Sequence, residues 1–206
     1  MALASVLFVA MHALVRDLSK DLHPFQIAFF RASLGLIVLS PIIFKNQFAI
    51  LRTSKIKLHA LRGLLNAGAM LCFFYGLSIT PLAQVTALSF AVPLFATLFA
   101  VLLLGEIIKI RRITALLIGF FGTLVIIRPG LIDFGLGPIL ILSQAIIWSL
   151  ALMVIKVLTR TDSSLTIAIY ASIFLSPMVL IAAIPVWQSP TVYQLILMLI
   201  IATFGT

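Results

Sequence analysis

Eight apolar stretches occupy most of the chain, and most of them are long enough to cross a membrane as a helix. They are residues 2–15, 24–44, 58–79, 82–104, 113–127, 136–158, 165–186 and a last stretch from 192 onward. A bilayer-spanning helix needs about 20 predominantly apolar residues. Charged residues make up only 9% of the chain, whereas soluble domains carry about 25%. The pattern predicts an all-α fold, a polytopic membrane helix bundle, and excludes a water-soluble globular protein.

The lysines and arginines are distributed unevenly between alternate connections. Ten of the 14 lie around residues 45–62, 109–112 and 156–160, and four lie on the other side, counting the outer part of the second stretch. Cytoplasmic loops carry the excess of Lys and Arg. We therefore expect a multi-pass protein of the cell membrane with a cytoplasmic N-terminus. No basic stripe alternates with stacking aromatic residues outside the apolar stretches, so nucleic-acid binding is not expected.

The chain also resembles itself at an offset of 140 residues. Four polar or basic positions have a similar residue 140 positions later, namely Arg16 and Lys156, Ser19 and Thr159, Lys20 and Arg160, and Gln26 and Thr166. The alternative is an accidental similarity of two hairpins, since apolar sequences match easily. A unit of five helices is odd in number, so a second copy enters the membrane from the opposite side. Inverted repeats of this kind underlie many secondary transporters, with the substrate site near the midplane.

Several short motifs cluster between residues 62 and 130. They are Thr80-Pro81, Pro93, Leu104-Gly105-Glu106, Arg111-Arg112 and Arg128-Pro129-Gly130. With the segment Phe25 to Arg31 upstream, they make the chain resemble the EamA family of the drug/metabolite transporter superfamily. Within that family, the branch assigned to S-adenosylmethionine uptake is the most similar.

The resemblance implies a ten-helix fold of two inverted five-helix halves that carries small organic metabolites through a central cavity. Residues 1–130 would form the first five-helix EamA repeat. Residues 136–206 would form an incomplete second repeat that lacks the last two to three helices.

Polar and aromatic side chains inside the apolar stretches are candidate substrate contacts. They are Asn66, Tyr75, Thr86, Phe90, Gln144, Trp148 and Tyr170. Thr86 and Phe90 share a helical face with Pro93, and Gln144 shares another with Trp148, because residues four apart lie on one side of a helix. Trp148 together with Tyr75 and Tyr170 would suit a cationic or aromatic ligand. The alternative for each residue is helix packing or an interhelical hydrogen bond.

Four further residues are candidates for gating or for a structural charge, namely Arg31, Pro93, Glu106 and Arg112. A proline inside a helix removes a backbone hydrogen bond and bends the helix, so Pro93 either flexes during gating or serves ordinary packing. Glu106 lies near Arg112 and other basic residues. It forms either an inner-gate salt bridge or an interfacial ion pair that holds the loop.

Arg31 lies about 10 Å below the outer interface, at 1.5 Å of rise per residue. Its side chain can reach outward to the lipid headgroups, or it can pair with Asp17 or Asp21. A third placement faces an anionic or carboxylate-bearing substrate, because charged residues within membrane helices commonly mark a substrate pathway.

Small residues recur at a spacing of four in two stretches. Gly68, Cys72 and Gly76 form one ridge, and Ala115, Gly119 and Thr123 form another. Ridges of this kind let neighbouring helices approach closely, so we expect a helix contact at each.

The motifs of other membrane protein classes are missing from the sequence. There is no His/Glu metal spacing, no nucleophile elbow and no P-loop. We therefore expect no enzyme, no cofactor and no metal, and a secondary carrier whose partners are a small-molecule substrate and the lipid bilayer. A non-transporting fragment or accessory membrane subunit is the alternative, a membrane-embedded enzyme is less favoured, and homo-oligomerisation stays open.

Overall fold

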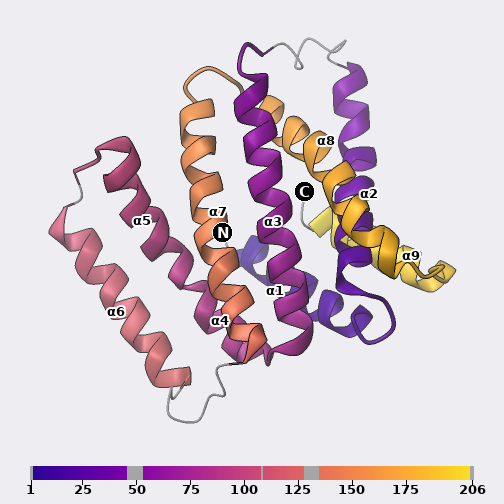
Figure 1. Cartoon of the computed structure of the whole chain (residues 1–206), viewed down its shortest axis with the longest axis horizontal. Coiled ribbons are helices and arrows are strands. Elements are labelled where there is room, and N and C mark those ends of the chain that lie inside the picture. Colours follow the sequence, from indigo (N-terminus) through magenta and orange to yellow (C-terminus); the bar gives the residue numbers. More distant parts are fainter. Residues whose placement is uncertain (1, 46–52, 108, 128–134, 205–206) are drawn as a thin grey trace.

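The computed structural model describes residues 2–45, 53–107, 109–127 and 135–204. This part of the chain is helical and contains no strand (Figure 1). The elements are α1 (Ala2–Leu18), α2 (Pro24–Lys45), α3 (Ile56–Ile79), α4 (Leu82–Ser89), α5 (Ala91–Leu104), α6 (Ile110–Ile127), α7 (Leu136–Leu158), α8 (Ser164–Ala183), the 3₁₀ helix η3 (Ile184–Val186) and α9 (Val192–Phe204). The all-α helix bundle predicted from the sequence is confirmed.

Four described segments are long and apolar enough to cross a membrane. They are α3, the pair α4–α5, α7, and α8 with η3. Large apolar side chains lie exposed on the outside of the bundle, for example Leu102 on α5, Ile118 on α6 and Ile181 on α8. Exposed apolar side chains of this size suit contact with lipid chains, so the chain is a multi-pass membrane protein.

The fourth apolar stretch is broken in the middle. Helix α4 ends at Ser89 and α5 begins at Ala91, with Phe90 as a turn between them. Pro93 causes the break because its ring displaces the carbonyl of Ser89, four residues earlier, and it has no N–H to donate. The helix is thus interrupted for one residue close to the bend predicted at Pro93. Ser149 of α7 lies against the break and donates a hydrogen bond to the carbonyl of Val92 (3.0 Å).

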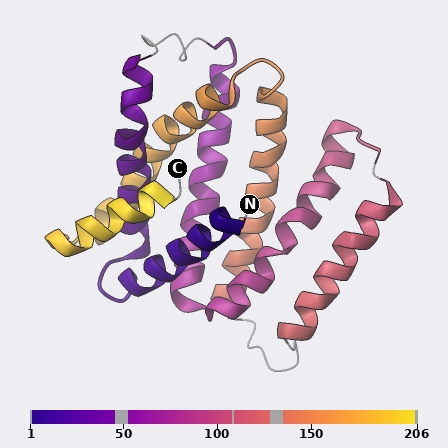
Figure 2. The same ribbon diagram turned by 180° about the vertical axis from the view of Figure 1, so that it is seen from behind.

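Helix α3 lies in the middle of the bundle, against α7 on one side and α8 on the other, and α2 packs on α8 (Figure 1). Helices α1 and α9 contact each other on the face turned toward the viewer in Figure 2. The buried core joins residues of α1, α2, α3, α8 and α9, among them Val15, Ile27, Leu77 and Val179.

Glycines on α3 allow its close approach to both neighbours. A Cβ on Gly63 would lie 2.3 Å from Cβ of Phe174 on α8, and one on Gly76 would lie 2.7 Å from Cδ1 of Ile141 on α7. Gly68 also faces α7, at an ordinary contact distance. The helix contact predicted for the first small-residue ridge is thus present.

The second ridge differs, because a Cβ on Gly119 would meet nothing within 4 Å in the described part of the chain. A periodic run of small residues shows that a close approach is sterically possible, but it does not supply the neighbouring helix.

The bundle has two ends with different chemistry. The start of α3 and the α7–α8 connection lie at the upper edge in Figure 1, and the end of α5 points toward the same end of the bundle. Lys55, Lys57, Lys156 and Arg160 lie in or near these segments, and Arg111 lies in the first turn of α6. We call this the basic end. The α1–α2 and α3–α4 connections lie at the opposite end.

Candidate functional site

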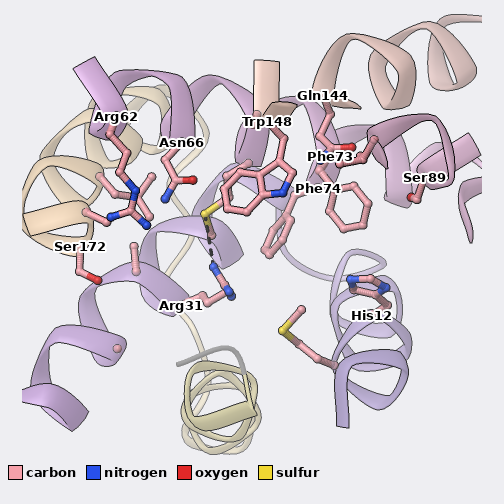
Figure 3. A pocket seen from close by; sticks show the side chains of 18 of the residues that line it. His12, Arg31, Arg62, Asn66, Phe73, Phe74, Ser89, Gln144, Trp148 and Ser172 are labelled. Atoms are coloured by element: carbon pink, nitrogen blue, oxygen red, sulfur yellow. Dashed lines mark hydrogen bonds between the residues drawn. The ribbon is translucent and has the colours of Figure 1, made fainter. Parts of the chain in front are cut away.

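A cavity of about 580 Å³ lies inside the bundle. Its walls come from α1, α2, α3, α4, α5, α7 and α8, so helices from both halves of the chain surround it (Figure 3). Ligand sites for small molecules commonly have volumes of about 300–1,000 Å³. The cavity is therefore large enough for an organic metabolite.

Two arginines line the cavity, Arg31 from α2 and Arg62 from α3. Arg31 Nη1 donates to Sδ of Met70 at 3.7 Å, and a thioether is a weak acceptor. Arg62 Nη1 donates to the carbonyl of Ile167 on α8. Arg31 lines the cavity, and Asp17 pairs with Lys20 at 2.6 Å, so a role of Arg31 toward a substrate stays a prediction.

Two side-chain amides also face this space, Asn66 from α3 and Gln144 from α7. The Oε1 atom of Gln144 is buried and has no hydrogen-bond partner in the described part of the chain. Asn66 is half-buried on the same wall. A buried polar atom without a partner costs free energy, so the Gln144 oxygen is a candidate acceptor for a bound solute.

Aromatic rings form another part of the wall. Trp148 of α7 and Phe73 and Phe74 of α3 line the cavity (Figure 3). Gln144 and Trp148 lie on it together, as their spacing of four predicts. Thr86 of α4 lines it as well.

The other predicted substrate contacts lie elsewhere. Tyr75 stacks with His23 at the opposite end of the bundle, with 6.0 Å between ring centroids, and burial lowers the pKa of His23. Tyr170 stacks on His59 at 4.6 Å, and Phe90 is 55% exposed at the helix break. The predicted trio of Trp148, Tyr75 and Tyr170 is thus not gathered in this cavity.

Glu106 and Lys156 join the α5–α6 connection to the end of α7. The neighbouring basic residues had suggested a partner close in sequence, but Lys156 lies 50 residues later.

Pro93 is exposed and does not line the cavity. The side chain of Arg112 falls outside the described residues, so its gating role stays a prediction.

The Glu106–Lys156 pair is expected to stabilise the fold only weakly. The two side chains are 33% and 43% exposed, and solvent-screened ion pairs contribute about 0–1 kcal/mol. A double-mutant cycle of Glu106→Gln and Lys156→Met, followed by denaturant unfolding in detergent micelles, should give a coupling energy below about 1 kcal/mol. A coupling energy several times larger would contradict the screened pair.

A second polar cluster at the basic end was not predicted. His59 Nε2 lies 3.4 Å from Oδ2 of Asp162, and both side chains are almost fully buried. The Tyr170 ring covers the imidazole. The cluster joins the start of α3 to the α7–α8 connection, residues about 100 positions apart.

Arg62 is the main cavity residue that sequence reasoning missed, because it was counted with the loop charges. It lies almost two turns inside α3, and an arginine at that depth is a functional candidate. The start of α3 near residue 56 was the signal that could have identified it. Among the described residues, no three His, Cys, Asp or Glu side chains gather as a metal site would require.

Known proteins resemble this chain in sequence. The model of the EamA-like transporter family matches residues 1–128. An S-adenosylmethionine uptake transporter of Rickettsia prowazekii is 32% identical over 189 residues, which cover 92% of this chain and 64% of that protein. A riboflavin transporter of Vibrio cholerae is 33% identical over 73% of this chain and 51% of its own length. A pseudopaline exporter of Pseudomonas aeruginosa is 33% identical over 62% of this chain and 44% of its own length.

A solved structure shares the fold. One crystal structure superposes with a TM-score of 0.68 at 19% sequence identity, covering 98% of this chain and 74% of that one. The three sequence relatives named above are longer than this chain, which spans about two thirds or less of the length of each. Each of them is named for transport and none for an enzymatic reaction.

Proposed function

Because the chain belongs to the EamA-like transporter family, we propose that it moves a small organic metabolite across the cell membrane by alternating access. The central cavity is the proposed binding site. The observation that carries this proposal is the buried Gln144 oxygen, which has no hydrogen-bond partner among the described residues and lies with Trp148 and Asn66 on the wall of a cavity surrounded by helices. Such a space, polar at a few points and apolar elsewhere, is typical of a small-molecule site.

The contacts between helices support the proposed inverted repeat of residues 1–130 and 136–206. At an offset of 140 residues, α1 corresponds to α7, α2 to α8 and α3 to α9. If each helix is replaced by its counterpart, the contact between α3 and α7 corresponds to a contact between α9 and α1. In the same way, the contact between α3 and α8 corresponds to a contact between α9 and α2. Both members of each pair are present, and α2 packs on its own counterpart α8.

The proposed orientation places the basic end and the N-terminus in the cytoplasm, according to the excess of Lys and Arg. Contacts between the two proposed repeats then lie on both sides of the cavity. His59–Asp162 and Glu106–Lys156 lie on the cytoplasmic side. Gln26 and the backbone of Gln188 lie on the outer side. Alternating access requires the contacts on one side of the cavity to separate while the contacts on the other side stay closed.

The sequence relatives suggest the first solute to test. One is named for S-adenosylmethionine uptake and matches 92% of this chain, so we propose uptake of this metabolite or of one similar in size. Purified chain in proteoliposomes should take up labelled S-adenosylmethionine with saturable kinetics.

Replacing Trp148 with Leu is expected to reduce this uptake about tenfold, because an aromatic contact in a desolvated site contributes roughly 1 kcal/mol or more. Trp187→Leu is the matched control. Trp187 packs on Phe29 and Phe30 outside the cavity, so uptake should stay close to that of the unmodified chain.

Absence of saturable uptake by folded protein, for S-adenosylmethionine and for a panel of amino acids and nucleosides in either direction, would contradict the carrier. It would favour the alternative of an accessory membrane subunit. Equal uptake by the Trp148→Leu and Trp187→Leu variants would remove the cavity from the proposal.

A further inference from the structure

A further cavity lies between α5 and α6, apart from the central one. It has a volume of about 500 Å³ and shares no lining residue with the central cavity. Most of its described lining residues are aliphatic and none is aromatic. The aliphatic ones are Leu94, Leu98, Val101, Ile107, Ile113, Leu116 and Leu117. We call this space the α5–α6 groove.

The α5–α6 groove lies on the outside of the bundle, where lipid surrounds the chain. Helix α6 forms the outer edge of the molecule in both Figure 1 and Figure 2, with α5 beside it. Leu98 and Leu117 line the groove and remain exposed. The volume is that of a ligand site, and a flexible acyl chain suits an aliphatic wall that offers no ring for stacking.

One polar group on the groove wall lacks a hydrogen-bond partner. The Thr97 side chain is 7% exposed, and its Oγ1 atom forms no hydrogen bond to another described residue. A threonine hydroxyl within a helix often bonds to the carbonyl four residues earlier, and a buried hydroxyl without any partner costs free energy. An occupant with an ester carbonyl accepts the hydroxyl hydrogen and offsets this cost, which a plain hydrocarbon cannot do.

Positive charge lies beside the groove, near the start of α6. Lys109 and Arg111 are exposed, and in sequence they lie between two residues that line the groove. Neither forms an ion pair with another residue in the described part of the chain. The acidic residue of the groove wall, Glu106, pairs with Lys156. The charge left over on this side of the groove is therefore positive, and it attracts an anionic headgroup.

We propose that the α5–α6 groove binds an anionic phospholipid of the leaflet at the basic end. One acyl chain lies between the two helices, an ester carbonyl accepts the Thr97 hydroxyl, and the phosphate lies against Lys109 and Arg111. Arg111 is less than two helical turns from Leu116 of the groove wall, so headgroup and chain positions are close together. Basic pockets between membrane helices commonly bind anionic headgroups. The site is separate from the central cavity and does not depend on the proposed carrier function.

Photolabelling of the full chain in lipid nanodiscs tests this proposal. The probe is phosphatidylglycerol with a diazirine on one acyl chain, and peptide mass spectrometry locates its adducts. Unlabelled phosphatidylglycerol and phosphatidylcholine with the same acyl chains serve as competitors. We expect adducts on groove residues such as Leu98 and Leu117. Phosphatidylglycerol should displace the probe there about tenfold more effectively than phosphatidylcholine, because two basic residues attract its net negative charge.

Leu64 supplies the reference for bulk lipid. It is an exposed apolar residue on α3, about two helical turns from the basic end of that helix, and Thr97 is equally far from the end of α5. Lipid beside Leu64 exchanges freely, so the two competitors should differ there by less than about twofold. A preference in the groove without one at Leu64 separates a bound lipid from general attraction to the basic end.

Variants then assign the preference to the named groups. Lys109→Gln combined with Arg111→Gln should reduce the preference for phosphatidylglycerol about tenfold. Thr97→Val keeps the branched side chain and removes the hydroxyl, so labelling of the groove should fall about threefold while the preference stays the same. Lys57→Gln is the matched control. It removes an exposed charge from the first turn of α3, away from the groove, and should change neither value.

Three results would overturn the proposed lipid site. Groove adducts that both competitors remove equally would show that bulk lipid fills the groove. Labelling of Leu64 without any adduct in the groove would show that protein, for example a second copy of the chain, covers it. An unchanged value in the variant of Lys109 and Arg111, or in Thr97→Val, would remove the contact assigned to the substituted side chain. Each of these results leaves the carrier function intact, because that function is judged from flux in proteoliposomes.

Discussion

Replacing Gly63 with Ala is expected to destabilise the fold by about 2–3 kcal/mol, at the upper part of the range for overpacking a close contact. The added Cβ would lie 2.3 Å from Cβ of Phe174 and 3.4 Å from its Cα. The Phe174 Cβ is fixed by its backbone, so no change of rotamer relieves the clash. Helices α3 and α8 must separate, which also weakens the bond from Arg62 to the Ile167 carbonyl.

Gly119→Ala is the matched control for this substitution. It is also a helical Gly→Ala change, but its Cβ would meet no described atom within 4 Å. Alanine favours a helix over glycine by about 1 kcal/mol, so this variant should be as stable as the unmodified chain or more so.

Cys72 is the chain's single cysteine, and it is half-buried on α3. Its reaction with a maleimide dye during heating therefore reports unfolding directly. Equal unfolding midpoints for Gly63→Ala and Gly119→Ala would contradict the close packing of α3 on α8.

Replacing Gln26 with Ala is expected to cost about 1–3 kcal/mol, the cost of leaving buried hydrogen-bonding groups without partners. The Gln26 side chain is fully buried at the start of α2. Its Oε1 accepts the backbone N–H of Gln188 at 3.0 Å, and its Nε2 donates to the carbonyl of the same residue. One amide therefore satisfies both backbone groups of a residue 162 positions away, after η3.

The partner residue supplies the control. Gln188 takes part only through its backbone, so Gln188→Ala should change the unfolding free energy by less than about 0.5 kcal/mol. Combining Gln188→Pro with Gln26→Ala removes the N–H that the single variant leaves without an acceptor and should recover part of the Gln26→Ala loss. Denaturant unfolding of the three variants in the same micelles makes the comparison, and an equal loss for Gln26→Ala and Gln188→Ala would refute the reciprocal pair.

Local features of the fold were predictable because they depend on neighbours in the sequence. The break near Pro93 follows from the missing N–H and the steric demand of one ring. The shared face of Gln144 and Trp148 follows from helical periodicity. The small residues of α3 likewise showed where close packing could occur, although the similar ridge around Gly119 showed that they do not name a partner.

The rest of the candidate site depends on contacts between distant segments. Tyr75 and Tyr170 are as amphipathic as Trp148, yet they stack at opposite ends of the bundle. Glu106 has basic neighbours in sequence, yet it pairs with Lys156 of another helix. Their placement depends on the rotation of each helix about its axis, and packing against neighbouring helices determines that rotation.

The sequence by itself thus determined three things: that the chain is a membrane helix bundle, where one of its helices breaks, and that it resembles a transporter family. These could be read from the sequence because apolar length, proline chemistry and motifs are local properties. Only the tertiary structure decided that Arg31 and Arg62 face one cavity with Asn66, Gln144 and Trp148. These five residues lie on three helices and span more than half the chain. Periodicity assigns each of them to a face of its own helix, and only the packing of α2, α3 and α7 brings those faces together.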